Sequence, residues 1–403
     1  MASFFQRTSS TLAGTVSRPF SNSRAESSSE FASKSSAVGS ASLSEALLKA
    51  NGLALQVNAI ETGKASCGQD NTPSGLVRAT SATQASTSTT SVNQNSESSS
   101  KAAKLPFLHG SMVALITPLK EDESVDFDAL TRLLEWHIES GTHGIVVMGT
   151  TGESATFGID EHLEVVRFVV DAVAGRVSVI AGTGANSTSE ALVLTAGAKD
   201  AGADACLLVT PYYNKPTQEG LFLHHKRIAE CVAIPQLLYN VPGRTGVDLL
   251  PETVLRLSKI DNIVGIKEAT GDVSRMRDIK RSVSKEFILL SGDDDTALEF
   301  MKCGGVGEIS VTANVCPKDV AEMCVAAHEG DMSRAKSIND RIASLHKSLF
   351  CESNPIPVKW AMHQLGFCTD VIRLPLTVLS EDKHDRVLRS MCIAGVIAQT
   401  KAS

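Results

Sequence analysis

The chain has 403 residues, of which 42% are hydrophobic and 21% are charged, so it can bury the core of one large soluble domain or two ordinary ones. Its formal net charge of −7 argues against a nucleic-acid partner or an anionic membrane surface, because both attract clustered Lys and Arg. No run of apolar residues approaches the length of a transmembrane helix.

Residues 1–104 differ in composition from the rest of the chain. Ser, Thr, Ala, Asn and Gln dominate this segment, which therefore cannot bury enough apolar surface to offset the entropy of ordering it. Its first part contains Arg7, Arg18 and Arg24 but no acidic residue before Glu26, a composition typical of an organelle transit peptide. We expect delivery to a plastid, with a mitochondrion or the cytoplasm as alternatives. A plain disordered tail is the competing interpretation.

From Leu105 onward, short apolar runs alternate with amphipathic stretches. The runs are mostly continuous and several are rich in β-branched residues, which is typical of strands buried on both faces of a parallel sheet. The eight predicted strands are Ser111–Thr117, Gly144–Met148, Ser178–Ala181, Ala205–Thr210, Gln236–Asn240, Ile263–Lys267, Phe287–Ser291 and Glu308–Thr312.

One helix is predicted between each pair of successive strands. Asp126 can cap the first helix and Gly141 can end it, while Gly175 can end the second. Eight such units predict an α/β protein, a (β/α)8 TIM barrel over residues 105–330, with a doubly wound open sheet as the competing layout. Strand signals cease after Gly330, so residues 331–403 are predicted to form a small C-terminal helical domain. The apolar faces of the first two helices are predicted to comprise Leu130, Leu133, Leu134, Ile138, Leu163, Val166, Val170 and Val173.

Active sites of such barrels lie at the carboxyl ends of the strands, so the residues that follow each strand are the candidates. After the second strand, Thr150 and Thr151 lie between two glycines, in a turn whose N–H groups can hold a small carboxylate. An ordinary turn before a helix is the alternative. The chain has only three tyrosines, and all of them follow predicted strands: Tyr212, Tyr213 and Tyr239.

Lys267 ends the sixth predicted strand, inside an apolar run. A buried lysine is costly unless it has a purpose, and burial favours the neutral amine that attacks a carbonyl carbon. The alternative is a lysine that reaches solvent from the strand edge or pairs with Glu268. Tyr239 on the neighbouring strand, as a possible proton shuttle, favours catalysis.

The seventh predicted strand ends in three consecutive acidic residues, Asp293, Asp294 and Asp295. Three acidic residues can indicate a metal site, but these open a helix, where carboxylates are favoured, and no His is near in sequence, so no metal is expected. The nine cysteines form neither a C-x-x-C pair nor a cluster with zinc-ligand spacing, which predicts reduced thiols in a protein that is not secreted.

Taken together, these motifs resemble the dihydrodipicolinate synthase family in order and spacing. The resemblance runs from about Phe107 to the C-terminus, is close to the bacterial form and leaves only the N-terminal tail outside. The motifs that carry it are Gly149–Ser154, Pro211–Pro216, Tyr239–Gly246, Gly265–Thr270, Ser291–Asp294 and Ser310–Asn314.

The resemblance implies a Schiff-base lyase that condenses pyruvate with L-aspartate 4-semialdehyde to 4-hydroxy-tetrahydrodipicolinate, the committed step of lysine biosynthesis by the diaminopimelate route. Lys267 would form the imine, so neither a metal nor an organic cofactor is expected. The resemblance also implies a homotetramer or homodimer, in which Tyr213 would reach in from a neighbouring subunit. The resemblance further implies that Tyr239 and Thr150 form a proton relay with Tyr213. Thr151 would hold the carboxylate of pyruvate, and Arg244 would bind the carboxylate of the aldehyde. Gly292 and Ile309 would contribute backbone atoms to the pocket.

The resemblance also implies an L-lysine effector site at a subunit interface. Glu190 is its central residue, because a carboxylate is the natural partner of an ammonium group, although an acid in the first turn of a helix opened near Ser187 is the alternative. Ile159 stands where lysine-sensing relatives often have histidine, so we expect inhibition of altered strength. The matching residues are Ser154, Ala155, His162, Asn186, Glu190 and Tyr212.

Two other functions remain open from the sequence. Another lyase on the same scaffold, of the N-acetylneuraminate lyase or keto-deoxy-sugar aldolase type, would share the lysine and its tyrosine. Arg244 and Thr151 argue against it, because a sugar acid offers no small terminal carboxylate for that arginine. A catalytically inactive barrel kept as a binding protein is the alternative of a different class.

Overall fold

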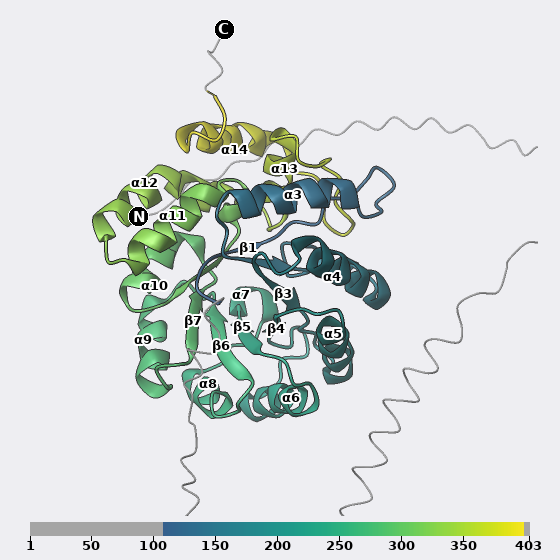
Figure 1. The fold of residues 1–403 in the computed structure, drawn as a ribbon, viewed down its shortest axis with the longest axis vertical. Coiled ribbons are helices and arrows are strands. Elements are labelled where there is room, and N and C mark those ends of the chain that lie inside the picture. The colour runs from purple at the N-terminus through teal and green to yellow at the C-terminus, as the bar shows by residue number, and fades with distance from the viewer. Residues whose placement is uncertain (1–107, 399–403) are drawn as a thin grey trace, which may run out of the picture. The chain divides into compact units, whose positions relative to one another are not determined.

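The computed structural model describes residues 108–398, so the predicted transit peptide lies outside the described residues. Eight parallel strands pair in sequence order and close into a barrel, with β8 hydrogen-bonded to β1 (Figure 1). This confirms the predicted TIM barrel and shows that the open-sheet alternative is wrong. The strands are β1 (Gly110–Ala114), β2 (Gly144–Val147), β3 (Ser178–Gly182), β4 (Ala205–Val209), β5 (Gln236–Asn240), β6 (Ile263–Glu268), β7 (Ile288–Ser291) and β8 (Gly307–Ser310).

Helices surround the strands, and further helices follow the last strand (Figure 1). Short 3-10 turns lie at Ser154–Thr156, Asp294–Thr296 and Thr312–Asn314. The α-helices are α3 (Phe127–Glu139), α4 (Ile159–Val173), α5 (Thr188–Asp200), α6 (Gln218–Cys231), α7 (Pro242–Thr245), α8 (Pro251–Leu257), α9 (Val273–Ser282), α10 (Ala297–Lys302), α11 (Pro317–His328), α12 (Met332–Ser348), α13 (Ile356–Gln364) and α14 (Glu381–Ile393).

Local sequence signals set the ends of the first helices. The Asp126 side chain accepts a hydrogen bond from Ala129 N and caps α3, as predicted. Gly141 follows that helix with a φ of 84°, a left-handed conformation that suits glycine. α4 ends at Val173, and Ala174 and Gly175 follow it with φ angles of 50° and 73°, so Gly175 stands after α4 as Gly141 stands after α3. The predicted stripe on α3 is buried at its three leucines, whereas Ile138 is half-buried.

Two predicted strands extend two or more residues beyond the observed carboxyl ends. β1 ends at Ala114 and not at Thr117, although Leu115 N still donates to Val146 O at 3.0 Å. β8 ends at Ser310 because the buried Asp294 carboxylate accepts the N–H groups of Val311 and Thr312, each at 3.1 Å. Those two N–H groups are therefore no longer available for pairing between strands. Such a side-chain acceptor from another loop cannot be read from the sequence of the strand itself.

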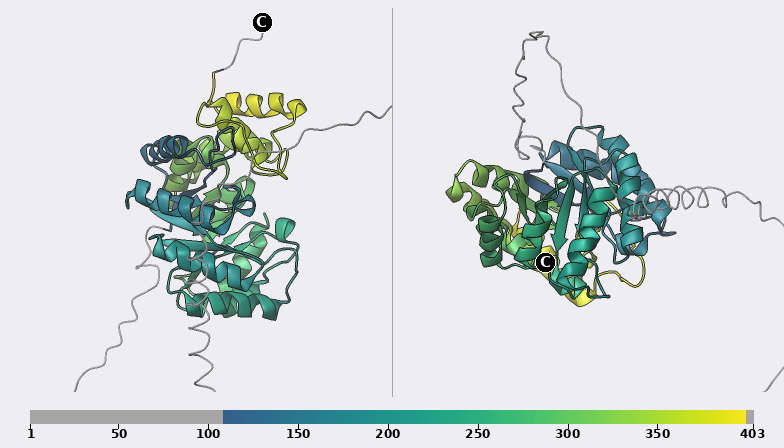
Figure 2. Two further views of the ribbon diagram at one scale, coloured as in Figure 1. Left: turned by 90° about the vertical axis from the view of Figure 1, so that its right-hand side faces the viewer. Right: turned by 90° about the horizontal axis from the view of Figure 1, so that it is seen from below.

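Three buried clusters form the core. One fills the barrel with inward-facing side chains of alternate strand positions, including Met112, Leu237 and Tyr239. The other two lie between strands and helices, and the larger one includes residues of α3, α4 and the C-terminal helices α12 to α14. Trp136 of α3 packs on Phe367 beyond α13, with ring centroids 4.3 Å apart. Figure 2 shows α13 and α14 (yellow) against the green and blue helices of the rest of the chain.

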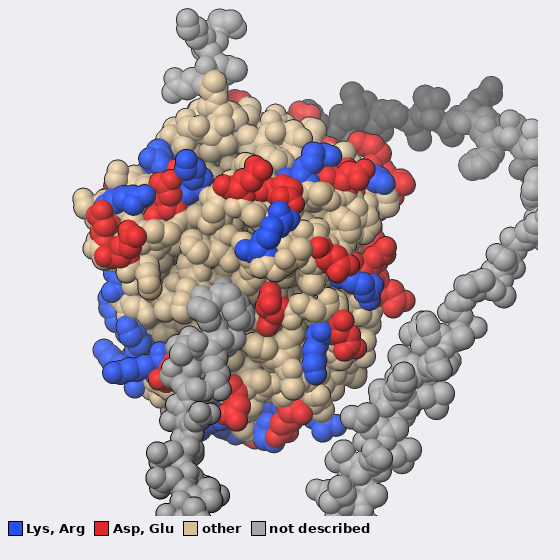
Figure 3. Space-filling model, viewed as in Figure 1, with Lys and Arg blue, Asp and Glu red and all other residues tan. Residues whose placement is uncertain are grey.

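The surface carries charges of both signs. On the face drawn in Figure 3, acidic and basic side chains are interspersed over the helices. Across residues 108–398, no helix is both long enough and apolar enough to cross a membrane.

Candidate active site

A cavity of about 610 Å³ opens at the carboxyl ends of the strands, where this type of barrel places its chemistry. Its inner wall includes strand residues such as Ala114, Val146 and Leu207. Its polar lining contains most of the residues singled out from the sequence: Thr150, Thr151, Ser154, His162, Glu190, Tyr212, Tyr239, Arg244, Lys267 and Gly292. Residues that are far apart in sequence thus line one cavity, as expected for residues that follow the strands of a barrel.

Lys267 lies at the centre of this arrangement. It is the fifth residue of β6, only 5% exposed, and its register partner on β5 is Tyr239. The ammonium nitrogen lies 4.4 Å from the centroid of the Tyr239 ring. Glu268 points to the opposite face of the strand and pairs with Arg275, so it is not the partner of Lys267. Among the described residues, no acidic side chain lies within ion-pairing distance of Lys267.

Gly292 at the end of β7 makes room for the Lys267 side chain. A Cβ atom on Gly292 would lie 2.7 Å from Lys267 Cε and 2.7 Å from Ala269 Cβ, closer than real Cβ contacts. The Gly292 N–H donates to Glu268 O at 2.7 Å, which fixes this close approach. Ile309 does not line the cavity; it is 1% exposed and packs in the barrel interior.

The three acidic residues after β7 serve the fold in different ways. Asp293 caps the following turn by accepting from Thr296 N at 3.2 Å and Thr296 Oγ1 at 2.6 Å. Asp294 is buried and binds the end of β8, a role that the sequence interpretation of a helix opening missed. Asp295 is exposed, 4.0 Å from Lys347. In residues 108–398, no group of three or more potential ligands is arranged for a metal ion.

The loop after β2 presents Thr150 and Thr151 to the cavity. Gly152 N donates to Gly149 O at 3.1 Å, which closes the tight turn that the sequence predicted. The N–H groups of Thr150 and Thr151 have no acceptor within residues 108–398 and can bind a carboxylate. The loop is flanked by two non-glycine residues with positive φ, Met148 at 52° and Glu153 at 62°, and such strain is common at functional sites.

Arg244 lies on the short helix α7 and lines the same cavity. Its Nη2 donates to Asn354 O at 3.1 Å, while Asn354 Nδ2 donates to Thr151 Oγ1 at 3.0 Å. Within the described part of the chain, Arg244 has no acidic partner at ion-pairing distance, as for Lys267. Two uncompensated cationic groups in one hollow favour substrates that carry carboxylates.

The expected proton relay is incomplete within one chain. Tyr239 and Thr150 both line the cavity, but no hydrogen bond joins their side chains in the described structure. Tyr213 does not line it: the residue is 90% exposed and its backbone has a φ of 73°. A bulky aromatic residue held in the left-handed region and projecting into solvent is unusual for a position that serves only the fold.

The outer part of the cavity collects most of the residues expected for an effector. Glu190 lies in the first turn of α5, whose N-cap is Ser187 as predicted, and it faces Tyr212. Burial raises the pKa of the Tyr212 phenol and the Glu190 carboxylate raises it further, whereas a backbone hydrogen bond from Asn186 lowers it. Ser154, Ala155 and Ile159 also line this part, but Asn186 is outside the lining.

His162 has a defined protonation state in this outer region. Its Nε2 lies 2.9 Å from Gly182 O, and since a carbonyl can only accept, Nε2 carries the proton. Burial lowers the pKa of His162 to about 4, so the ring is neutral at neutral pH and Nδ1 is an acceptor.

The sequence did not reveal the contribution of the C-terminal segment to the cavity. Asn354 bridges Thr151 and Arg244, and Lys359 forms a fully buried ion pair with Glu153 of the β2 loop. The Asn354-Pro355 dipeptide is a turn signal, but nothing in it indicates contacts about 200 residues away in sequence. Further lining residues from this segment are Phe350, Ser353, Pro355, Pro375 and Leu376.

Comparisons with known proteins agree with this geometry. The sequence profile of the Dihydrodipicolinate synthetase family matches residues 107–393. The 4-hydroxy-tetrahydrodipicolinate synthase of Saccharophagus degradans is 61% identical over 290 residues, which cover 72% of this chain and 100% of that protein.

Two solved structures have the same fold over the same region. The chloride-inhibited dihydrodipicolinate synthase from Acinetobacter baumannii, complexed with pyruvate, has a TM-score of 0.71 and 53% identity, over 72% of this chain and 100% of that chain. DHDPS from Cyanidioschyzon merolae with lysine bound has a TM-score of 0.70 and 38% identity, and the match covers 72% of this chain and 99% of that chain. With the barrel, the buried lysine and these relatives in agreement, the chain belongs to the dihydrodipicolinate synthetase family.

Proposed function

We propose that this chain condenses pyruvate with L-aspartate 4-semialdehyde, through an imine on Lys267, to give 4-hydroxy-tetrahydrodipicolinate. One observation carries the proposal: a 5% exposed lysine points into the cavity, stacked on Tyr239, with no acidic partner among residues 108–398. A lysine used only for stability would be paired, as Lys359 is with Glu153. The name of the S. degradans relative supports the same reaction.

The chemistry follows from the groups that line the cavity. The Lys267 amine, once it has given up its proton, adds to the C2 carbonyl carbon of pyruvate; the carbonyl oxygen takes up protons and leaves as water, and the imine nitrogen takes up one proton, which gives a protonated imine. The imine withdraws electrons from the neighbouring methyl carbon, which loses a proton and becomes the nucleophilic end of an enamine. That carbon forms a bond to the aldehyde carbon of the second substrate. The amino group of this substrate then displaces Lys267 from C2, which closes the ring and frees the enzyme.

The side chains around Lys267 can divide the remaining tasks. Thr151 and the N–H groups of its turn would hold the pyruvate carboxylate, and the Arg244 guanidinium would hold that of the aldehyde. Tyr239 and Thr150 would transfer protons together with Tyr213 of a second subunit, because Tyr213 is exposed and absent from its own cavity. This proposal requires a homo-oligomer of at least two chains, and a homotetramer would satisfy it.

Trapping with borohydride tests the proposed imine. Purified protein is incubated with pyruvate and borohydride, and the labelled peptide is identified by mass spectrometry. The label is expected on Lys267, while Lys359, the other buried lysine among the described residues, serves as the internal control. An unlabelled protein or a label on Lys359 contradicts the proposal. Activity with aspartate semialdehyde but not with N-acetylneuraminate separates this function from the related lyases, and any turnover excludes an inactive binding protein.

L-lysine is the effector that fits the outer part of the cavity. Glu190 offers a carboxylate for its side-chain ammonium, and neutral His162 offers an acceptor nitrogen. The C. merolae relative, solved with lysine bound, supports the proposal. Lysine is expected to inhibit partially and non-competitively with pyruvate, and Glu190→Ala is expected to weaken inhibition. Equal inhibition of both proteins, or none at millimolar lysine, contradicts it.

Plastid delivery of the chain is a further part of the proposal, and it rests on the composition of residues 1–104. A reporter fused to this segment is expected in plastids. A reporter that stays in the cytosol contradicts the transit-peptide assignment. A reporter found in mitochondria contradicts the plastid and supports the mitochondrion as the destination.

A further inference from the structure

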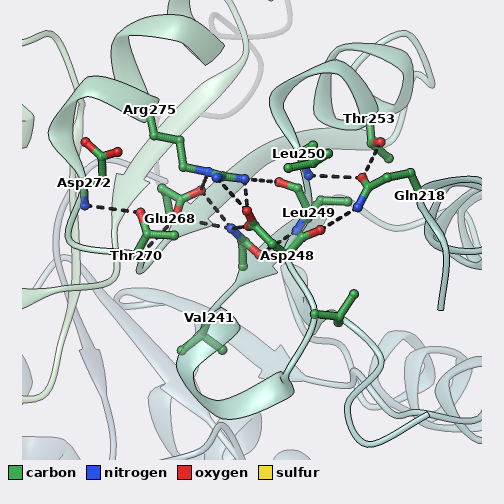
Figure 4. A network of polar contacts seen from close by, with 12 residues as sticks. Gln218, Val241, Asp248, Leu249, Leu250, Thr253, Glu268, Thr270, Asp272 and Arg275 are labelled. Carbon is green, nitrogen blue, oxygen red and sulfur yellow. Dashed lines mark hydrogen bonds and ion pairs between the residues drawn. The ribbon is translucent and has the colours of Figure 1, made fainter. Parts of the chain in front are cut away.

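A polar network joins Glu268, Asp248 and Arg275 (Figure 4). It lies on the face of the sheet opposite to Lys267 and Tyr239. Side chains alternate along a strand, so the residues that follow this pair, Asn240 and Glu268, point away from the cavity. They are register partners, just as Tyr239 and Lys267 are. We call Asn240, Asp248, Glu268 and Arg275 the clasp.

Arg275 of α9 joins the members of the clasp. Its Nε donates to Glu268 Oε2 at 3.1 Å, while Nη1 and Nη2 reach the two carboxylate oxygens of Asp248 at 2.9 and 2.8 Å. Nη2 also donates to Leu249 O at 2.5 Å. One guanidinium therefore connects β6, next to Lys267, with the segment 241–250, which contains α7 and Arg244.

Asn240 completes the connection from β5. Its Nδ2 donates to Asp248 Oδ1 at 2.9 Å and to Glu268 Oε2 at 3.2 Å, and its Oδ1 accepts from Leu249 N at 3.0 Å. Asn240 is 0% exposed and Glu268 is 3% exposed, so little water competes for these bonds. Burial raises the pKa of Glu268, and Arg275 opposes that rise.

Gln218 at the start of α6 holds the far side of the same segment. Its Nε2 donates to Asp248 O at 2.6 Å, and its Oε1 accepts from Leu250 N at 3.2 Å and Thr253 Oγ1 at 2.6 Å (Figure 4). Gln218 contacts neither Glu268 nor Arg275 through these bonds. The segment 241–250 thus has one anchor shared with β6 and one that is separate from it.

We propose that the clasp residues Glu268 and Arg275 are positioning residues that align Lys267 with Tyr239 and, through Asp248, hold the segment that carries Arg244. The inference rests on the proposed imine chemistry. Three features support alignment over a general contribution to stability. The network binds the residues directly after Tyr239 and Lys267, it spans the strand pair at the reacting groups, and it connects the two substrate sides of the cavity. A displacement of about 1 Å at a reacting group can cost about 100-fold in rate.

The test compares two arginines of the same helix. Arg275→Met removes the centre of the clasp, while Arg281→Met removes an exposed arginine whose partner Asp278 is one turn away. For each variant, rapid borohydride trapping gives the rate of imine formation with pyruvate, and the fraction trapped at the end point gives the amount of folded enzyme. Steady-state kinetics give KM for the aldehyde.

Arg275→Met is expected to slow imine formation about 10- to 100-fold at a full end point and to raise the aldehyde KM. Glu268→Gln is expected to slow imine formation, whereas Gln218→Leu is expected to raise the aldehyde KM and leave the imine rate unchanged. Arg281→Met is expected to match the wild type. If Arg275→Met does not fold, Arg275→Lys, which keeps the charge but not the forked geometry, is expected to show a smaller loss of the same kind.

The outcomes separate this inference from the function on which it rests. A wild-type protein that forms no imine overturns the proposed function, and the clasp with it. A wild type that forms the imine while Arg275→Met and Glu268→Gln form it at the same rate overturns the clasp alone. Variants that lose only thermal stability, with unchanged imine rate and aldehyde KM, also overturn it, because they show that the network serves the fold only.

Discussion

The buried ion pair between Lys359 and Glu153 gives the sharpest prediction about stability. Lys359 lies on α13 in the C-terminal segment, and Glu153 ends the β2 loop that presents Thr150 and Thr151. Their side chains are only 1% and 0% exposed. The second Glu153 oxygen accepts from Arg373 N at 3.1 Å. Burial lowers the pKa of Lys359, and the Glu153 carboxylate opposes that shift.

Lys359→Met keeps the length of the side chain but leaves the Glu153 carboxylate buried without its cation. Breaking a buried pair by removing one partner costs about 3–5 kcal/mol in the free energy of unfolding, because one charge stays desolvated and uncompensated. Glu153→Gln is expected to cost a similar amount, because it leaves the Lys359 ammonium buried without its carboxylate, and one amide oxygen cannot serve both Lys359 Nζ and Arg373 N. The double variant is expected to be more stable than Lys359→Met, because no buried charge remains.

Urea unfolding at a fixed protein concentration measures these differences, and the constant concentration removes effects of association on apparent stability. Two results refute the reasoning. One is a Lys359→Met protein within about 1 kcal/mol of the wild type, which is the value of an exposed pair. The other is a double variant that loses as much as the sum of the single losses, which shows that the two side chains are not energetically coupled.

Three further predictions concern the cavity and the buried histidines. Gly292→Ala is expected to slow imine formation about 10- to 100-fold in trapping experiments, since its Cβ would lie 2.7 Å from Lys267 Cε; an unchanged rate contradicts the close approach. Arg244→Ala is expected to lower kcat/KM for the aldehyde about 100-fold while pyruvate imine formation persists, and an equal loss for both substrates contradicts its role. Burial lowers the pKa of seven described histidines below the ordinary 6.5, and it does so most for four of them, to about 3 or about 4 where a value is resolved, so the folded state binds fewer protons than the unfolded chain. The stability they contribute is therefore complete above about pH 6.5 and is lost toward pH 4, and thermal melts that show no such loss contradict this assignment to His137, His162, His224 and His225.

The sequence by itself determined the barrel and singled out Lys267 as the candidate nucleophile. A strand buried on both faces must be a short apolar run, and this requirement is local, so all eight strands were located to within a few residues. Lys267 was conspicuous for the same reason, because a charge inside such a run contradicts the pattern. Strand order placed the residues after each run at one rim, and the cavity there contains Thr150, Arg244 and Lys267.

Only the tertiary structure decided what surrounds and supports these residues. Asn354 reaches Thr151, and Lys359 reaches Glu153, across sequence separations of 203 and 206 residues. Such contacts depend on how the C-terminal helices pack on the barrel and leave no periodic trace in either segment. Glu268 illustrates the same limit: adjacent to Lys267 in sequence, it could have been its partner. The alternation of a strand turns the two side chains to opposite faces, and the helix that packs outside supplies Arg275 instead.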